Sequence, residues 1–273
     1  MRHVAAIQMA SGPNVGANLI EAERLISQAV DAGAGLLVLP ENFAQMGQTE
    51  QDKLTIVETE GQGQIQDFLS EQANKHDLWL VGGTIPLACD KPDKVRAACL
   101  VYNPEGKMVA RYDKIHLFDV DIVATRESYI ESETTEPGDK VVTIDTPYGK
   151  LGLAVCYDLR FPELFRLLLD QGAEIFAVPS AFTAITGRAH WESIIRTRAI
   201  ENLCYVIAAA QGGYHVSGRE THGDSMIVDP WGTVIDRLPR GSGYVIANVD
   251  KERLESTRTN FPALSHRRLC VNG

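Results

Sequence analysis

The sequence lacks the features that mark disulfide-stapled, zinc-binding and membrane-spanning proteins. None of its five cysteines forms a Cys-x-x-Cys pair, so neither a disulfide framework nor a zinc site is expected. No apolar run approaches the roughly 20 residues of a membrane span. The apolar segment 1–13 is too short and too interrupted for a signal peptide, and it is better interpreted as a first strand. We therefore expect a reducing, cytoplasmic setting.

The sequence also lacks a block of basic residues and the glycine-rich motifs of nucleotide-binding loops. Asp and Glu number 36 against 26 Lys and Arg, and the formal net charge of −10 argues against a nucleic-acid partner. Alternating strands and helices would suit a flavodoxin-like nucleotide-binding domain, but the chain has only the pair Gly82-Gly83 and no G-x-G-x-x-G or P-loop. Because no linker-like stretch or internal repeat divides the chain, we expect a single domain.

What the sequence does contain is an alternation of apolar runs with segments of helical period. Helices are predicted at 18–32, 63–76, 161–172 and 191–202, with a short polar helix after 249. Strands are predicted at 3–9, 36–39, 79–84, 95–103, 108–118, 151–155, 174–179, 204–209, 225–228, 234–237 and 244–249. Segment 118–139 shows no clear period and is predicted to be irregular. This order predicts a large α/β domain in which two mixed sheets pack between helices.

The segment LGLAVCYDLRFPE, at 151–163, joins a buried strand to a helix through a reactive side chain. Residues 151–155 are apolar or small, Cys156 follows directly, and Pro162 stands near the first turn of the next helix. Such a turn lifts the thiol out of the sheet and points the backbone N–H groups of the helix start towards it. A cysteine after an apolar strand is commonly a core residue, so the rest of the chain must decide between the two roles.

Two further reactive side chains follow predicted strands. Glu41 comes after the strand 36–39, and Lys114 lies near the end of the hairpin strand 108–118. The carboxyl edge of a sheet is where α/β proteins usually carry their chemistry. A thiol, a carboxylate and an ammonium group at neighbouring strand ends suit a nucleophile, a general base and an oxyanion stabiliser. Each residue alone also fits an ordinary core or surface role, and residue chemistry leaves both interpretations open.

Three motifs, in this order, resemble those of the nitrilase, or carbon–nitrogen hydrolase, superfamily. They are PEN at 40–42, YDKIHLFDVD at 112–121 and LGLAVCYDLRFPEL at 151–164. The resemblance covers the chain to about Arg268, which places one domain at 1–268 and a C-terminal tail at 269–273. It implies a four-layer α-β-β-α sandwich with two mixed central sheets. It also implies a Glu–Lys–Cys triad that hydrolyses amides or nitriles through a thioester, with no metal or cofactor.

The resemblance assigns a role to each residue of the triad. Cys156 is the nucleophile, and Glu41 is the general base that takes its proton. Lys114 stabilises the tetrahedral intermediate together with the backbone N–H of Tyr157. Nearby carboxylates raise the pKa of a buried thiol, so we expect no free thiolate, and proton transfer to Glu41 during attack solves this.

Many members of the superfamily have a second active-site glutamate, and two positions in this chain fit. The Glu-Ser pair at 131–132 precedes the Pro-Gly pair at 137–138 at the usual separation, and we therefore choose Glu131. The segment Arg-Glu-Ser at 126–128 also resembles the motif, so Glu127 stays open as the alternative.

The second half of the chain resembles one branch of the superfamily in particular. The segments 179–192, 196–213 and 226–234 are similar to the branch that hydrolyses deaminated glutathione to 2-oxoglutarate and cysteinylglycine. The alternatives are an ω-amidase acting on α-ketoglutaramate, an N-carbamoyl-amine hydrolase, and a binding protein without catalysis. The expected partner is a small, anionic amide substrate, and the chain is expected to form a homo-oligomer, a dimer or larger.

An anionic substrate needs cationic groups in its pocket, and four arginines are candidates. Arg160 lies four residues after the thiol, and Arg188, Arg196 and Arg198 flank the segment His190-Trp191. Bidentate pairing of arginine with carboxylate suits the task, although Arg160 fits stacking on Phe161 equally well. Arg196 and Arg198 are two positions apart, so they cannot both face the pocket.

Other residues near these motifs are expected to shape the pocket. The expected lining residues are Tyr157, Arg160, Phe182 and Thr183. Trp191 is expected to pack in the core rather than against the substrate. The segment 222–225 reads His-Gly-Asp-Ser, where the branch commonly has Gly-His-Ser. We expect Asp224 to alter a subunit contact or the rim of the pocket.

Overall fold

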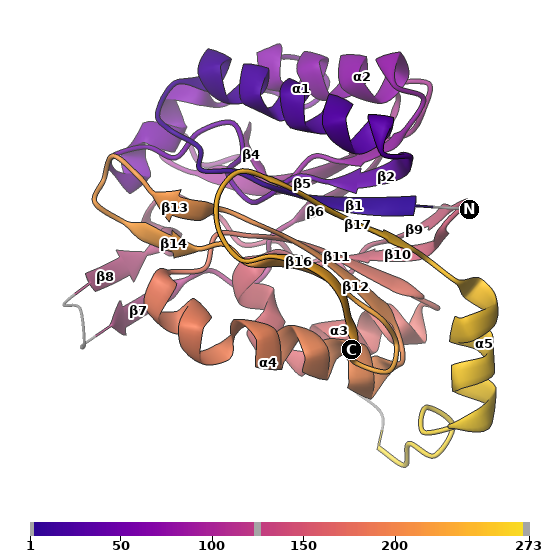
Figure 1. Cartoon of the computed structure of the whole chain (residues 1–273). Coiled ribbons are helices and arrows are strands. Elements are labelled where there is room, and N and C mark those ends of the chain that lie inside the picture. Colours follow the sequence, from indigo (N-terminus) through magenta and orange to yellow (C-terminus); the bar gives the residue numbers. More distant parts are fainter. Residues whose placement is uncertain (1–2, 123–126, 270–273) are drawn as a thin grey trace.

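The computed structural model describes residues 3–122 and 127–269 of the chain (Figure 1). Its helices are α1 Val15–Asp31, α2 Gln64–Lys75, α3 Pro162–Asp170, α4 Ala184–Asn202 and α5 Lys251–Asn260, with 3-10 helices at Glu50–Ile56, Glu131–Glu133 and Cys156–Arg160. Its strands are β1 His3–Gln8, β2 Ala34–Val38, β3 Trp79–Val81, β4 Ile85–Ala88, β5 Val95–Tyr102, β6 Met108–Asp113, β7 Asp119–Ile122, β8 Glu127–Ile130, β9 Thr143–Thr146, β10 Gly149–Leu153, β11 Ile175–Ser180, β12 Tyr205–Ala210, β13 Gly212–Tyr214, β14 Glu220–His222, β15 Ser225–Val228, β16 Val234–Leu238 and β17 Gly243–Asn248. No helix within these ranges is long and apolar enough to cross a membrane. Arg126 and residues 270–273 of the expected tail lie outside the described residues.

Two large sheets lie face to face, with helices on the outer face of each (Figure 1). The first sheet has the order β17-β1-β2-β3-β5-β4 with β6 paired to β5, and the second has the order β16-β15-β12-β11-β10-β9. Helices α1 and α2 cover the first sheet, and α3 and α4 cover the second. Both sheets combine parallel pairs, such as β1–β2 and β11–β12, with antiparallel ones. The predicted α-β-β-α sandwich with two mixed sheets is confirmed.

The central strands are apolar along their length because both of their faces are buried. Along β1, Val4 and Ala6 belong to the core between the sheets, whereas Ala5 and Ile7 pack with the apolar faces of α1 and α2. Helix α1 begins where the side chain of Asn14 accepts a hydrogen bond from an N–H of the first turn. Alternate side chains of β1 therefore face the second sheet on one side and the helices on the other, and the cap sets where α1 begins.

Several predicted elements have different bounds in the structure. The strand predicted at 108–118 ends at Asp113. The strand predicted at 79–84 breaks after Val81, because Gly83 adopts a φ of +60° and the chain starts a separate strand, β4. The helix predicted at 191–202 begins already at Ala184, where the side chain of Thr183 caps its first turn. A glycine near the start of this helix interrupts the apolar period on which the prediction depended.

Some short strands are missing from the sequence prediction. Segment 118–139, predicted to be irregular, contains the hairpin β7–β8 and the 3-10 helix Glu131–Glu133. The strands β7 and β8 read DVDI and ESYI, so their acidic residues hide any alternation of apolar side chains. Strands β9, β13 and β14 are three or four residues long, which is too short to show a period.

The close approach of Gly83 to the segment before Glu41 yields a prediction about stability. A Cβ at Gly83 would lie 2.1 Å from the carbonyl oxygen of Pro40, whereas a Cβ at Gly61 would meet nothing within 4 Å. Both glycines have positive φ, so both alanine variants carry the conformational cost, which is about 1–2 kcal/mol. We expect Gly83→Ala to lower the free energy of unfolding by about 1–3 kcal/mol more than the control Gly61→Ala, measured by chemical denaturation. Equal losses in the two variants would contradict this close packing.

Candidate active site

Strand direction brings Glu41 and Lys114 to the same edge of the first sheet. Strands β2 and β3 are parallel, and β5 is antiparallel to both β3 and β6, so β2 and β6 run the same way. Glu41 follows β2, and Lys114 follows β6 directly. Both side chains are buried, at the layer where the first sheet faces the second.

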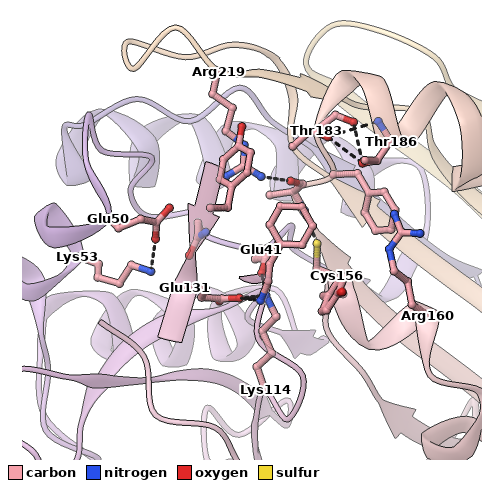
Figure 2. A pocket seen from close by; sticks show the side chains of 16 residues that line it. Glu41, Glu50, Lys53, Lys114, Glu131, Cys156, Arg160, Thr183, Thr186 and Arg219 are labelled. Atoms are coloured by element: carbon pink, nitrogen blue, oxygen red, sulfur yellow. Dashed lines mark hydrogen bonds and ion pairs between the residues drawn. The ribbon is translucent and has the colours of Figure 1, made fainter. Parts of the chain in front are cut away.

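The thiol comes from the second sheet, through a turn that differs from the predicted one. Strand β10 ends at Leu153 rather than at 155, and Cys156 opens a 3-10 helix before α3 begins. Cys156 has a φ of +49°, a left-handed conformation that non-glycine residues rarely adopt. The backbone N–H of Ala181 donates a hydrogen bond to Sγ over 3.5 Å. The sulfur therefore faces the cavity that also contains Glu41 and Lys114 (Figure 2).

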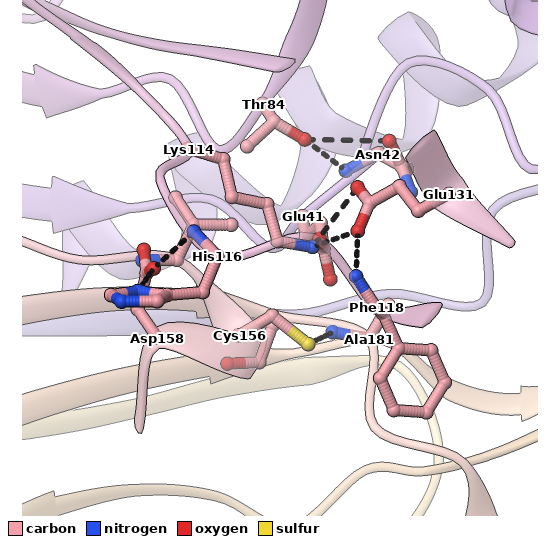
Figure 3. A network of polar contacts seen from close by, with 12 residues as sticks. Glu41, Asn42, Thr84, Lys114, His116, Phe118, Glu131, Cys156, Asp158 and Ala181 are labelled. Carbon is pink, nitrogen blue, oxygen red and sulfur yellow. Dashed lines mark hydrogen bonds and ion pairs between the residues drawn. The ribbon is translucent and has the colours of Figure 1, made fainter. Parts of the chain in front are cut away.

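The ammonium group of Lys114 lies between two carboxylates (Figure 3). Its Nζ is 2.8 Å from Oε1 of Glu41, and 2.8 and 3.0 Å from Oε2 and Oε1 of Glu131. The side chain of Lys114 is only 2% exposed. Glu127, the alternative second glutamate, lies on β8 beside an outer hollow instead. The structure thus places Glu131 beside the lysine and the cysteine, and Glu127 away from Lys114.

Backbone and side-chain donors fix the two carboxylate segments. The backbone N–H of Phe118 donates to Oε2 of Glu131 over 2.7 Å. The side chain of Gln211 donates to the backbone carbonyl of Glu41 over 3.1 Å, and the N–H of Asn42 donates to the hydroxyl of Thr84 over 2.9 Å. Both of the latter contacts are made by the peptide unit that follows Glu41, and they fix the backbone from which its carboxylate extends.

Burial and charge set the protonation states of this cluster. Burial by itself would lower the pKa of Lys114, but the charges of Glu131 and Glu41 outweigh it and raise that pKa well above its usual value. Burial opposes ionisation of Glu131, yet the charge of Lys114 and hydrogen bonds hold the pKa of Glu131 below its usual value. Burial, with the negative charge of Glu41, raises the pKa of Cys156 well above its usual value. At neutral pH the site therefore has a charged lysine, an ionised Glu131 and a neutral thiol.

A carboxylate that does not line the cavity accepts hydrogen bonds from both the lysine segment and the cysteine segment. Asp158 is fully buried, and its carboxylate accepts hydrogen bonds from the backbone N–H of His116 at 3.0 Å and from the hydroxyl of Tyr112 at 2.6 Å. The same carboxylate lies 2.6 Å from the ring Nδ1 of His116. It also accepts the backbone N–H of Val155 at 2.8 Å. Its partners lie on both sides of Lys114 and directly before the cysteine. Asp158 thus fixes the position of one reactive segment relative to the other.

The expected pocket residues meet in one cavity, whose space, including the part that is open to solvent, is about 510 Å³. The cavity is lined by Tyr157, Arg160, Phe182 and Thr183 together with the reactive residues. The guanidinium of Arg160 lies 5.8 Å from the ring centre of Tyr157 and 5.4 Å from that of Phe182. Its Nη1 is 3.3 Å from Nδ1 of His190. Arg160 therefore lies against two aromatic rings, and its side chain lines the cavity.

The other candidate arginines lie elsewhere. Arg188 lines a separate hollow on the surface. Arg196 donates to the carbonyl of Gly232, and Arg198 is buried with two donors on the carbonyl of Leu159. These three side chains are therefore absent from the lining of the reactive cavity.

Trp191 and Asp224 belong to one buried contact rather than to the cavity wall. The indole of Trp191 is fully buried, and its Nε1–H donates to the carbonyl of Asp224 over 2.7 Å. The carboxylate of Asp224 receives two hydrogen bonds from Arg237, at 2.9 and 2.6 Å. Asp224 therefore stabilises the connection between α4 and β16 and borders the surface hollow of Arg188.

Several lining residues were not anticipated from the sequence. They are Asn42, Glu50, Lys53, Phe118, Tyr129, Ala181, Thr186 and Arg219. Lys53 pairs with Glu50 at 2.7 Å. Glu50, Lys53, Tyr129 and Arg219 lie in segments without an apolar period or a recognisable motif, so only the fold brings them to the cavity. Within residues 3–122 and 127–269 no cluster of histidine, cysteine and acidic side chains could hold a metal ion.

Comparison with known proteins finds relatives along nearly the whole chain. The family model described as carbon-nitrogen hydrolase matches residues 3–259. A deaminated glutathione amidase of Yersinia enterocolitica is 41% identical over 270 residues, which are 97% of this chain and 93% of that protein. Omega-amidase NIT3 of Saccharomyces cerevisiae is 38% identical over 273 residues, 98% of this chain and 94% of that protein. The crystal structure of S. cerevisiae Nit3, a member of branch 10 of the nitrilase superfamily, matches with a TM-score of 0.88 at 35% identity, covering 98% of this chain and 97% of the other.

The charges around the thiol predict how a neutral substitution changes its reactivity. Burial and, after it, the charge of Glu41 raise the pKa of Cys156, so we expect Glu41→Gln to move the pH profile of Cys156 alkylation to lower pH. The measurement is the rate of iodoacetamide labelling against pH, with Cys156→Ala showing the labelling of the other cysteines. Glu50→Gln is the matched control, since it removes a carboxylate from the same cavity that is paired with Lys53. A Glu41→Gln profile at the wild-type position or above would contradict this electrostatic account.

Proposed function

The chain belongs to the carbon–nitrogen hydrolase family, and from this premise we propose that it hydrolyses the amide bond of deaminated glutathione through a thioester on Cys156. The observation that carries the mechanism is the buried Lys114, held at 2.8 Å from each of two glutamates beside a neutral thiol. That arrangement offers a nucleophile, a proton acceptor and a positive charge for an oxyanion within one cavity.

The high pKa of the thiol determines the first step. Since Cys156 is neutral at rest, its proton must leave as Sγ attacks the amide carbon, and the carboxylate of Glu41 is the proposed acceptor. The carbonyl oxygen gains negative charge in this step. We assign its stabilisation to the Nζ of Lys114 and the backbone N–H of Tyr157.

The remaining steps reuse the same groups. Glu41 gives its proton to the departing nitrogen as the C–N bond breaks, which leaves a thioester on Cys156 and a free amine. Glu41 then takes a proton from a water molecule that attacks the thioester, and the thiol leaves with a proton as the acid is released. Glu131 remains ionised throughout and keeps Lys114 charged. Each step balances without a metal or another cofactor.

The choice of substrate rests on the relatives and on the charge of the cavity. Proteins named deaminated glutathione amidase are 41% identical to the chain over nearly its full length, in bacteria and in mammals. Deaminated glutathione has a carboxylate at each end, and Arg160 presents a guanidinium to the cavity. The second candidate is ω-amidase activity on α-ketoglutaramate, favoured by the 38% identical yeast relative of that name. We also propose that the protein is cytoplasmic and forms a homo-oligomer, a dimer or larger. Light scattering of the purified protein tests the oligomeric state.

A substrate panel tests the function. It offers the purified protein deaminated glutathione, α-ketoglutaramate, an N-carbamoyl amine and a simple nitrile. We expect kcat/KM to be highest for deaminated glutathione, by about 10-fold or more, with 2-oxoglutarate and cysteinylglycine as products. A higher value for α-ketoglutaramate would overturn the substrate and keep the family chemistry. Release of carbon dioxide would instead indicate a carbamoyl-amine hydrolase.

The same assay tests the nucleophile. We expect Cys156→Ala to lower kcat by at least about 10⁴-fold while the far-ultraviolet circular dichroism and the unfolding midpoint change little. Cys204→Ala, at a buried cysteine outside the cavity, is the control and should keep full activity. Wild-type turnover by Cys156→Ala would exclude the thioester mechanism, and inactivity of the wild type on every substrate would favour a binding protein.

A further inference from the structure

The charges that line the cavity do not all pair with one another. Lys114 is paired with Glu41 and Glu131, and Lys53 is paired with Glu50. Two lining cations remain, Arg160 and Arg219, and in the described part of the chain neither has a carboxylate within salt-bridge distance. Two such guanidinium groups, in a cavity whose other charges are paired, match two carboxylates on a ligand.

Arg219 is held rigidly but has an unused donor. Its guanidinium lies 5.1 Å from the ring centre of Tyr129, and its Nη2 donates to the carbonyl of Ala181. Its backbone carbonyl accepts the N–H of His215 over 2.9 Å, which fixes the loop between β13 and β14. The Nε–H of Arg219 is buried and has no hydrogen-bond partner among the described residues. A buried donor without a partner is costly unless a ligand fills the position.

Arg219 and Arg160 approach the thiol from different sides. The carbonyl of Ala181 accepts a hydrogen bond from Arg219, and its N–H donates one to Sγ of Cys156, so a single residue links the guanidinium to the sulfur. Arg160 follows Cys156 in the chain and lies against Phe182. Figure 2 shows the sulfur between the two arginines. A substrate with its scissile carbonyl at Sγ would therefore have one guanidinium towards each end.

The space beyond Arg219 identifies which end of the substrate it faces. Arg219 also lines an outer hollow, whose space, including its opening to solvent, is about 1060 Å³. The two spaces share the lining residues Asn42, Glu50, Lys53, Tyr129 and Arg219. Asn42 is the residue after Glu41, the proposed donor of the proton to the departing amine. The leaving group must therefore lie near this side, where there is room for a dipeptide and a way out.

We propose that Arg219 binds the C-terminal carboxylate of the leaving dipeptide and so selects a peptide amide over a primary amide. This inference rests on the proposed function and assigns one arginine to each end of the proposed substrate. Arg219 is a specificity-determining residue that contacts the substrate away from the bond that breaks. Arg160 faces the other end and binds the carboxylate of the α-keto acid, which stays on the enzyme as the thioester.

The experiment compares two substrates that differ only in the distal charge. One is deaminated glutathione, and the other is its C-terminal amide, in which the glycyl carboxylate is neutral. We expect the wild type to prefer the carboxylate roughly 10- to 100-fold in kcat/KM, mostly through KM, because the contact lies far from the reacting atoms. Arg219→Gln should lose this preference. Its kcat/KM for the amide analogue and for α-ketoglutaramate should stay within about 3-fold of the wild-type values.

Two control variants separate binding from structure. Arg188→Gln removes a guanidinium from the separate surface hollow and should keep the wild-type preference. Arg160→Gln should lower kcat/KM for deaminated glutathione and for its C-terminal amide alike, since both substrates have the α-keto acid end. If Arg219→Gln lowered kcat/KM for both substrates equally, Arg219 would only support the fold. If the variant kept the preference, the C-terminal carboxylate would bind elsewhere. Either result would overturn the inference. A wild type without activity on either substrate would instead overturn the proposed function, and with it this inference.

Discussion

Burial of one ammonium group between two carboxylates is the constraint on which the site depends. Moving a lone charge out of water costs several kcal/mol, so Lys114 is stable at 2% exposure only because Glu41 and Glu131 lie at hydrogen-bond distance. Burial of the neighbouring thiol, together with the charge of Glu41, raises the pKa of Cys156 and keeps it protonated. A neutral cysteine then needs a base at the moment of attack, which is the task proposed for Glu41. The resting electrostatics and the proposed chemistry thus have the same origin.

The sandwich makes this cluster possible because each of its sheets supplies a different part. Glu41 and Lys114 follow strands of the first sheet, while Cys156 follows a strand of the second. Asp158 joins the two by accepting hydrogen bonds from both segments in a fully buried position. Three donors and the contact with the ring of His116 on one carboxylate hold the lysine segment and the cysteine segment together. The positive φ of Cys156 is the local strain that this network holds in place.

The sequence predicted the layers and the main reactive residues because both depend on signals that are local in the chain. Apolar runs identify strands buried on two faces, and motif order identifies Glu41, Lys114 and Cys156 as candidates. The hairpin β7–β8 could not be predicted, since its four-residue strands are half acidic and show no alternation. Arg219 was missed for a different reason. Its loop becomes part of the cavity only through tertiary contacts with Tyr129 and Ala181, which no spacing in the sequence records.

The most direct test of the account is detection of the covalent intermediate. The wild-type protein is mixed with deaminated glutathione, quenched in acid within the first turnovers and measured as an intact mass, followed by peptide mapping. The account predicts an adduct with the mass of 2-oxoglutaric acid less one water, confined to the peptide that contains Cys156 and absent from Cys156→Ala. An adduct on another residue, or rapid turnover by the Cys156→Ala protein, would contradict it.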